Sequence, residues 1–307
     1  MMPWIAEYHR GWRIHLLRTH VALNEKLARC WSLRQAHFPD HTIIFDYPVD
    51  TVSISLTGRL CALQCAHCNA QYLQHMTPIE QALERAAGAP SCLISGGSDR
   101  LGRVPVTSHL QEIAALAEGR RLNWHVGLIE EAEMDAIAPY VHTVSFDFVG
   151  DTETIREVYG LNRTVDDYIR VYQALRRRFR VVPHLTIGLR GGQLGHELPA
   201  LHLLKELGVS DTLVFLVLIP TAGTAYADRQ PPAVEDAVDL IAEGRLLFPD
   251  TQISLGCMRP HGEYRERLDS LAVRAGVNRI VSPDRVAVQV AGELGLTIVR
   301  KTECCVF

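Results

Sequence analysis

The sequence has no apolar run long enough to cross a membrane. Its most apolar stretch, LVFLVLIP (213–220), is far shorter than the ~20 residues that a membrane-spanning helix needs. The N-terminal segment carries Glu7, Arg10 and Arg13 where a secretion signal would have an apolar run. We therefore expect a soluble, cytoplasmic protein with no membrane partner.

The sequence also lacks an excess of positive charge. Its formal net charge is −4, and its one short basic cluster, RRRFR (176–180), is typical of the solvated end of a helix. A nucleic-acid partner is therefore not expected. Low-complexity segments, Gly/Ser linkers and clear repeats are missing as well, and the hydrophobic content of 47% predicts a large core.

Short apolar runs alternate with helix-like segments from residue 51 onward. The runs that we interpret as strands are 51–58, 91–97, 121–128, 143–150, 181–189, 212–220, 252–260 and 278–283. Eight strands alternating with helices predict a parallel sheet and an α/β fold, a (β/α)8 TIM-type barrel. We expect a helical extension over 1–45, the barrel over 46–295 and a cysteine-bearing tail over 296–307.

Polar and reactive residues interrupt these strands, although a strand buried on both faces should be almost wholly apolar. The positions are Cys92, Asn123, His125, Asp147, His184, Thr186, Cys257 and Arg259. Several of them, such as Asn123 and His125, lie two apart, which places both side chains on one face of a strand. These residues predict a functional cavity inside the barrel, with its active site at the C-terminal strand ends.

Three cysteines follow the first predicted strand, in the stretch TGRLCALQCAHCNAQYLQHM. Their spacing is C-x3-C-x2-C, and they are Cys61, Cys65 and Cys68. Thiolates favour zinc or iron–sulfur clusters. A structural zinc site usually takes two C-x2-C halves, and only one is present, although His67 or His75 could supply a fourth ligand. Three thiolates on a four-iron cluster would leave one iron open to a substrate.

This loop resembles the signature of the radical S-adenosylmethionine (SAM) superfamily, which carries C-x3-C-x2-C after the first barrel strand. The resemblance implies a [4Fe–4S] cluster that binds SAM, and catalysis through a 5′-deoxyadenosyl radical that abstracts hydrogen from an unactivated C–H bond. SGGSD resembles the family's glycine motif for SAM, although Ser98 stands where the family often has an acid. The SAM-binding positions implied in this way are Gly96, Gly97, Ser98, His125, Asp147, Thr186, Gly188 and Pro220.

Five further cysteines lie outside the loop. Clustered cysteines in a reducing cytosol indicate a metal or catalysis rather than disulfides. The members of the superfamily called biotin synthases hold an auxiliary cluster inside the barrel with strand cysteines and one arginine. Cys92 resembles the second-strand ligand of those enzymes, whereas their third- and fifth-strand cysteines are absent and His125 and His184 lie on those strands. Four thiols, enough for an auxiliary cluster, are supplied by Cys92, Cys257 and the tail pair Cys304 and Cys305, and Arg259 is the candidate catalytic arginine. One of the adjacent pair Cys304–Cys305 can be spare, and Cys30 is more typical of an inert thiol.

From about residue 45 the chain also resembles a narrower group, the biotin-synthase-like component of the two-protein lipoyl synthase best known from archaea. The motifs that carry this resemblance include CALQCAHC, CLISGGSDR, IPTAGT, LGCMRPHGEYR and the final ECC. It implies sulfur insertion into an octanoyl chain on a lipoyl domain or glycine-cleavage H protein. It also implies a second radical SAM protein, an electron donor such as ferredoxin, and an auxiliary cluster as sulfur source.

Two other functions stay open. One is a radical SAM isomerase or sulfur-insertion enzyme of the biotin synthase kind that acts on a free small metabolite. The other is a binding module stabilised by zinc or a cluster. A polar barrel interior favours the enzymes, because a binding module does not need four such residues inside: His125, Asp147, His184 and Arg259.

Overall fold

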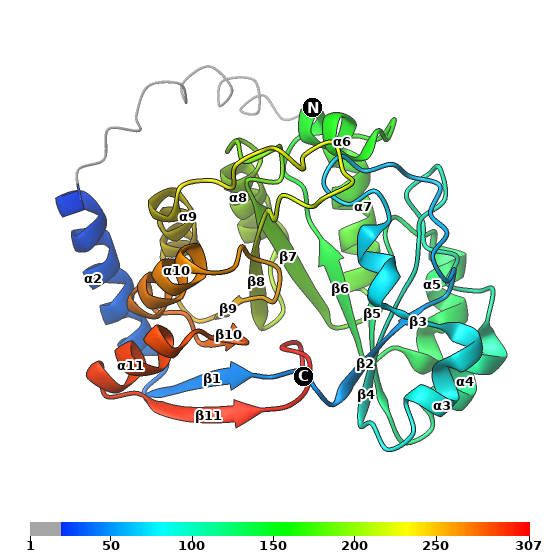
Figure 1. Cartoon of the computed structure of the whole chain (residues 1–307), viewed down its shortest axis with the longest axis horizontal. Coiled ribbons are helices and arrows are strands. Elements are labelled where there is room, and N and C mark those ends of the chain that lie inside the picture. The colour runs from blue at the N-terminus through cyan, green and yellow to red at the C-terminus, as the bar shows by residue number, and fades with distance from the viewer. Residues whose placement is uncertain (1–19) are drawn as a thin grey trace.

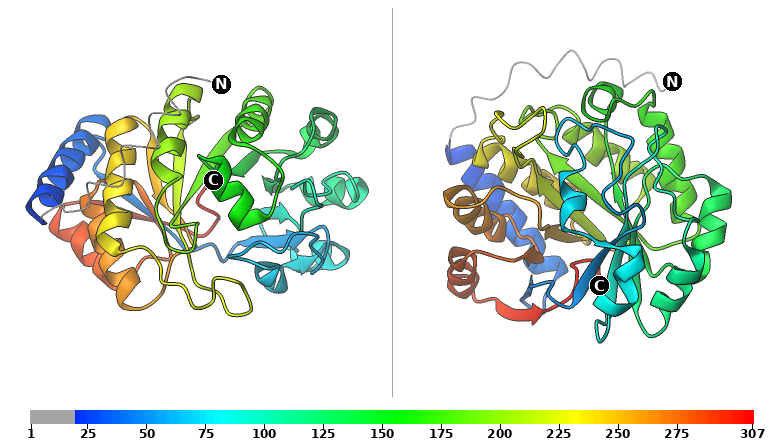
Figure 2. Two further views of the ribbon diagram at one scale, coloured as in Figure 1. Left: turned by 90° about the horizontal axis from the view of Figure 1, so that it is seen from above. Right: turned by 45° about the vertical axis from the view of Figure 1, so that its right-hand side comes forward.

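The structure, a computed structural model, describes residues 20–307 (Figure 1). Its centre is a curved sheet of eleven parallel strands in the order β11-β1-β10-β9-β8-β7-β6-β5-β4-β2-β3. Helices cover the convex side of this sheet (Figures 1 and 2). The predicted α/β fold with a barrel-like parallel sheet is therefore confirmed. Residues 1–19 of the predicted helical extension lie outside the described residues.

Eight strands coincide with the eight predicted apolar runs. They are β2 (Thr51–Ser55), β4 (Ser91–Ser95), β5 (Arg121–His125), β6 (Thr143–Asp147), β7 (Val181–Ile187), β8 (Thr212–Val217), β9 (Gln252–Leu255) and β10 (Arg279–Val281). Three further strands are not among the predicted runs: β1 (Thr42–Asp46), β3 (Thr77–Pro78) and β11 (Thr297–Lys301). The predicted helical extension thus ends in a strand, and the predicted tail begins with one.

The sheet is not closed by direct strand pairing. Within residues 20–307, β10 pairs with β1 instead of β2, and β1 pairs with β11. Isolated hydrogen bonds connect the two ends: the Asp50 amide donates to the Thr302 carbonyl over 2.9 Å, and the Cys304 amide donates to Thr51 Oγ1 over 2.8 Å. The segment after β11 therefore joins the two ends of the open sheet.

Ten α-helices are present in the described part of the chain. They are α2 (His20–His37), α3 (Ala82–Arg85), α4 (Leu110–Ala117), α5 (Glu131–Ile137), α6 (Thr152–Tyr159), α7 (Val165–Arg176), α8 (Glu197–Leu207), α9 (Val234–Leu247), α10 (Glu263–Arg274) and α11 (Arg285–Glu293), with short 3-10 turns η2 (Gln71–His75), η3 (Ile79–Gln81) and η4 (Ala138–Tyr140). None of the helices in residues 20–307 has the length and apolar character needed to cross a membrane.

Local sequence explains how the helices next to the site begin and end. Asp151 caps α6 by accepting a hydrogen bond from the Thr154 amide, and Gly160 ends it in the left-handed region. Thr164 and Asp167 form a reciprocal capping box at the start of α7. These caps define where both helices begin and where α6 ends.

Helix α2 attaches the N-terminal part to the rest of the chain. Its Lys26 forms ion pairs with Asp239 and Glu243 of α9, at 2.9 and 2.7 Å. The Cys30 thiol is fully buried and donates to the Ala242 carbonyl, and burial raises its pKa to about 11. Cys30 therefore packs between two outer helices, as expected of an inert thiol.

Arg259 has a structural role instead of the expected catalytic one. Its guanidinium is fully buried and binds both carboxylate oxygens of Asp269 in α10, over 2.7 and 2.8 Å. It also donates to the Gly256 carbonyl. The side chain extends from the end of β9 to the helix layer, so it cannot face the interior of the sheet at the same time.

We expect Arg259→Met to lower the free energy of unfolding by ~3–5 kcal/mol, because Asp269 would be left buried without its cation. Urea denaturation measures this loss. The matched control is Arg267→Met in α10, the helix that carries Asp269. The pair of Arg267 with Glu235 is partly exposed, so its loss should change the stability by less than ~1 kcal/mol. Equal stabilities of the two variants would contradict this role of Arg259.

Candidate active site

The three cysteines of the C-x3-C-x2-C loop lie together after β2. Burial raises the pKa of Cys65 to about 12, and the charges of the neighbouring Cys68 and Cys61 thiolates add to that effect. In residues 20–307 no group of three Cys, His, Asp or Glu side chains is arranged to enclose a single ion. A four-iron cluster does not require that arrangement, since each cysteine ligates a different iron.

Two neighbouring segments hold this loop in place. The Ala66 amide donates to the Val158 carbonyl of α6 over 2.7 Å, and the Ala66 carbonyl accepts from the Tyr226 amide over 3.0 Å. The Asn69 side-chain amide donates to the Gly223 carbonyl. The loop is thus fixed by α6 on one side and by the segment after β8 on the other.

The glycine motif after β4 lies directly against the cysteine loop. The Gly97 amide donates to Thr57 Oγ1, and the Ser98 carbonyl accepts from the Ala62 amide over 2.8 Å. A Cβ atom at position 97 would lie 1.9 Å from the Leu60 carbonyl oxygen and 2.6 Å from Cys61 Cα. Only glycine fits this close approach of two backbones.

Asp99, the acidic residue of this motif, binds its own turn and not the cysteine loop. The Asp99 carboxylate accepts hydrogen bonds from the Leu101 and Arg103 amides and pairs with the Arg103 guanidinium. Asp99 therefore stabilises its own turn. Ser98 is the residue that contacts the cysteine loop, with its carbonyl oxygen 3.9 Å from Cys61 Sγ.

His67 offers an unused polar atom beside the cysteines. Its ring lies 6.3 Å from that of Tyr72 and 5.6 Å from that of Tyr159, and burial lowers its pKa to about 4. The buried Nδ1 has no hydrogen-bond partner within the described part of the chain. An orphan buried nitrogen next to three converging thiols, together with the glycine contact, fits a site built for a bound group.

Three titratable residues of β5, β6 and β7 meet on the concave face of the sheet. His125 Nδ1 is 3.7 Å from Asp147 Oδ2, and the rings of His125 and His184 are 5.4 Å apart. Burial opposes the charge of Asp147, but the hydrogen bond and charge of His125 hold its pKa below the ordinary value. Burial lowers the pKa of His184 to about 4, so this imidazole is neutral at pH 7.

These residues line an interior space. The side chain of Asp147 is 54% exposed, yet burial is the largest influence on its ionisation. Cys257, just after β9, is also exposed to solvent, yet burial raises the pKa of its thiol. A side chain that is open to solvent but surrounded by protein faces a cavity rather than the outer surface.

The end of the chain enters this interior from the N-terminal ends of the strands. Arg180 donates to the Val306 carbonyl over 2.7 Å, and Arg279 donates to Phe307 O over 2.9 Å. The Arg121 guanidinium lies 4.7 Å from the centre of the Phe307 ring. Three arginines from β5, β10 and the approach to β7 therefore hold the tail below the histidines.

The two tail cysteines have different surroundings. Cys305 packs in an apolar layer of interior valines: Val182, Val214, Val281 and Val306. Cys304 Sγ lies 3.8 Å from the Asn123 amide nitrogen, and that residue's Oδ1 accepts a hydrogen bond from Ser145. The hydrogen bond from Cys305 lowers the pKa of Cys304. Cys304 is thus the cysteine that faces the polar interior.

The structure brings Cys257 to Cys304 but leaves Cys92 apart. Burial and the charge of Cys304 both raise the pKa of Cys257, so the two thiols influence each other electrostatically. Cys92 lies in register with Val52 and Leu122 and packs in the core between the sheet and the helices. Its neighbour Ser91 faces inward instead and bonds Thr51. The expected ligand role of Cys92 is therefore corrected.

The remaining predicted positions lie at the ends of β7 and β8. Gly188 has a φ of 71°, and its amide donates to the buried Glu197 carboxylate over 2.7 Å. The Thr186 carbonyl lies 3.0 Å from His196 Nε2. Pro220 precedes the segment that contacts the cysteine loop through Thr221 and Tyr72. Sequence reasoning missed His196 and Glu197. They stand at the start of a helix, and no local pattern there indicates that their side chains bind the backbone of neighbouring loops.

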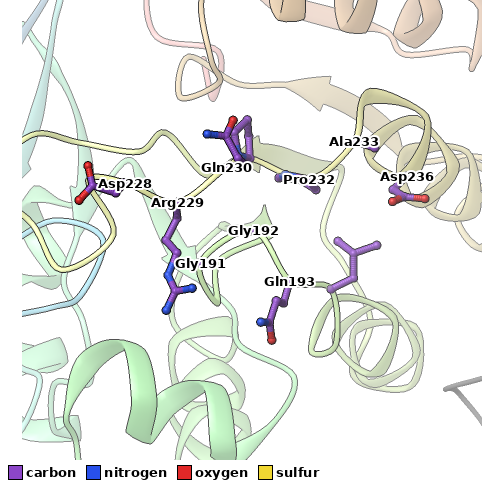
Figure 3. A pocket seen from close by; sticks show the side chains of 11 residues that line it. Gly191, Gly192, Gln193, Asp228, Arg229, Gln230, Pro232, Ala233 and Asp236 are labelled. Carbon is purple, nitrogen blue, oxygen red and sulfur yellow. The ribbon is translucent and has the colours of Figure 1, made fainter.

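A surface hollow lies between the loops after β7 and β8 (Figure 3). It is lined by Gly191–Leu194 and by residues from Asp228 to Asp236. The loops touch closely, since a Cβ on Gly192 would lie 1.9 Å from the Gln230 carbonyl. None of the cysteines or interior histidines lines this hollow, so it is separate from the candidate site.

Comparisons with known proteins agree with this geometry. No model of a known protein family matches the chain. A segment of 82 residues is 37% identical to a biotin synthase of Gloeobacter violaceus, so the match spans 25% of each protein. The structure is similar to that of methylornithine synthase (PylB), with a TM-score of 0.66 and 16% identity over 92% of this chain and 91% of that one.

A second solved structure shares the fold. It is the FeFe-hydrogenase maturase HydG from Carboxydothermus hydrogenoformans, with a TM-score of 0.66 and 14% identity over 92% of this chain and 73% of that one. At such low identity these likenesses show the fold alone. Together with the cysteine loop after the first barrel strand and the local match to a biotin synthase, this fold is similar to that of radical SAM proteins.

Proposed function

We propose that the chain is a radical SAM sulfur-insertion enzyme, one component of a split lipoyl synthase. Its substrate would be an octanoyl-lysine on a lipoyl domain or glycine-cleavage H protein, and a second radical SAM protein would act with it. One observation carries this proposal: outside the cysteine loop, Cys304 lies 3.8 Å from the amide of Asn123 among the polar interior residues, and its charge influences the thiol of Cys257.

The cysteine loop and the glycine motif, here called the upper site, have residues that suit a SAM-binding cluster. Cys61, Cys65 and Cys68 would hold it, and Gly97 lets the glycine motif approach the loop. When bound, the cluster and SAM supply the 5′-deoxyadenosyl radical. Asp147 stays anionic and His184 stays neutral in the space beneath, where they can orient a ligand and exclude bulk water.

The interior residues around Cys257 and Cys304, here called the lower site, differ from the four-cysteine set expected from the sequence. Cys92 is outside and Cys305 is in an apolar layer, which leaves Cys257 and Cys304 as thiol donors. His125 and His184 face the same space, and histidine replaces cysteine on one iron of some clusters. The Asn123 amide lies close enough to the Cys304 sulfur to orient it. An iron–sulfur cluster held here would supply the sulfur.

The alternative is an enzyme of the biotin synthase kind that acts on a free small metabolite. Its support is the local match to a biotin synthase and the fold shared with a methylornithine synthase. Both alternatives need the same upper site, so the substrate must distinguish them.

The substrate test is anaerobic incubation of the reconstituted chain with SAM, dithionite, a partner radical SAM protein and an octanoylated carrier peptide. We expect thiolated peptide and 5′-deoxyadenosine by mass spectrometry, and Cys65→Ala should form neither. 5′-Deoxyadenosine without sulfur on the peptide would reject the lipoyl synthase proposal. Turnover of a free metabolite without the carrier would favour the alternative.

The glycine contact predicts a selective defect. Gly97→Ala should displace the cysteine loop and lower SAM cleavage about 100-fold, since a shift of ~1 Å in a reacting site has effects of this size. Iron bound per chain should fall as well. Gly292→Ala in α11, outside the candidate site, is the matched control, because its Cβ would meet nothing within 4 Å. Equal activities of the two variants would contradict the proposed packing.

The different surroundings of the tail cysteines predict different effects on metal content. After anaerobic reconstitution, the native chain should bind more than the ~4 irons of one cluster. Cys304→Ala should reduce iron and sulfide to about one cluster, while Cys305→Ala should keep the native content. Iron analysis with EPR measures both, and a native content of ~4 irons would remove the lower site.

A further inference from the structure

Two large apolar side chains are exposed beside the cysteine loop. Leu60 is 79% exposed and directly precedes Cys61, and Leu101 is 45% exposed in the turn after the glycine motif. The two turns are joined by the hydrogen bond from the Ala62 amide to the Ser98 carbonyl. The leucines are therefore carried by two turns that are hydrogen-bonded to each other beside Cys61.

Both leucines lie on ordered turns. The Leu60 amide donates to the Thr57 carbonyl, and Thr57 Oγ1 donates to the Leu60 carbonyl over 2.8 Å. The Leu101 amide donates to Asp99 Oδ1 over 2.8 Å. The backbone thus holds both apolar side chains in water next to the cysteine loop.

Positive charge accompanies the leucines. Arg59 and Arg100 each precede one of them, and both side chains are exposed. Within residues 20–307 neither guanidinium has an ion pair or hydrogen bond, whereas most other arginines of the sheet edges and helices are paired. The chain as a whole carries a net charge of −4, so this patch is locally opposite in sign.

We propose that Arg59, Leu60, Arg100 and Leu101 form the docking surface for a small acidic electron-transfer protein. This proposal rests on the proposed radical SAM function, in which one electron must reach the cluster from outside for each SAM cleaved. The reduced donor is oxidised by one electron and the cluster is reduced by one, without a change in bonds or protons. Leu60 is covalently adjacent to a cluster cysteine, so a donor seated there has the shortest path.

The size and charge of the surface fit such a partner. Four side chains make a small contact, typical of weak redox encounters that bury less than ~1,200 Å². An acidic donor is repelled by the net negative chain but attracted by the two unpaired arginines, so charge both orients the complex and speeds its formation. A carrier protein has a different requirement, because its acyl chain must enter the interior of the sheet.

The test compares two reductants of the same holoenzyme. Reduced flavodoxin serves as the acidic protein donor and dithionite as the small one, and 5′-deoxyadenosine formation is followed at low salt. Arg59→Glu/Arg100→Glu and Leu60→Ser/Leu101→Ser should lower the flavodoxin-driven second-order rate about 10-fold or more. Both should keep the dithionite-driven rate. The matched control, Val299→Ser/Arg300→Glu on the exposed edge strand β11, should change neither rate.

Each other outcome overturns a defined statement. Equal losses with both reductants would place the effect in the cluster site, and unchanged rates with flavodoxin would remove the surface. Loss of binding to an octanoylated carrier peptide, with flavodoxin unaffected, would assign the surface to the carrier. If native enzyme forms no 5′-deoxyadenosine with dithionite, the proposed function fails. NMR titration with oxidised flavodoxin then tests the surface alone, and equal shifts in native and charge-reversed chains would reject it.

Discussion

The candidate site depends on the alternation of side chains along parallel strands in register. Neighbouring strands pair residue by residue, so every second side chain of each strand points to the same interior side of the sheet. This constraint brings Asn123 and His125 beside Ser145 and Asp147, and it turns Cys92 away to the helices. A shift of one residue in any strand would exchange the polar and apolar faces.

The interior is completed by a segment from the end of the chain. Since β10 pairs with β1 instead of β2, a seam remains that strand pairing does not close. The residues after β11 cross this seam and are held by Arg121, Arg180 and Arg279. One face of the inserted segment is apolar and supports Cys305, and the other presents Cys304 to the polar space. The same segment after β11 therefore bridges the open sheet and brings the Cys304 thiol into the interior.

Much of this arrangement could be predicted from the sequence, because its signals are local. The eight apolar runs predicted the barrel strands, and the period of two predicted that His125, Asp147 and His184 would share the interior. Whether Arg259 faces in or out depends on its distant partner Asp269, which no local pattern identifies. The strand at 42–46 was missed for the same reason, since it exists through pairing with β10 and β11.

The two thiol sites should differ in how they take up metal. Burial raises the pKa of Cys65 and Cys68, so these thiols are protonated at neutral pH before a cluster binds. Metal must then displace protons, and loading is expected to be favoured by higher pH. The hydrogen bond from Cys305 lowers the pKa of Cys304, which makes a thiolate available without that cost. The two adjacent cysteines are thus not equivalent ligands. Cys305, in the apolar layer, donates a hydrogen bond, and Cys304, in the polar space, accepts it.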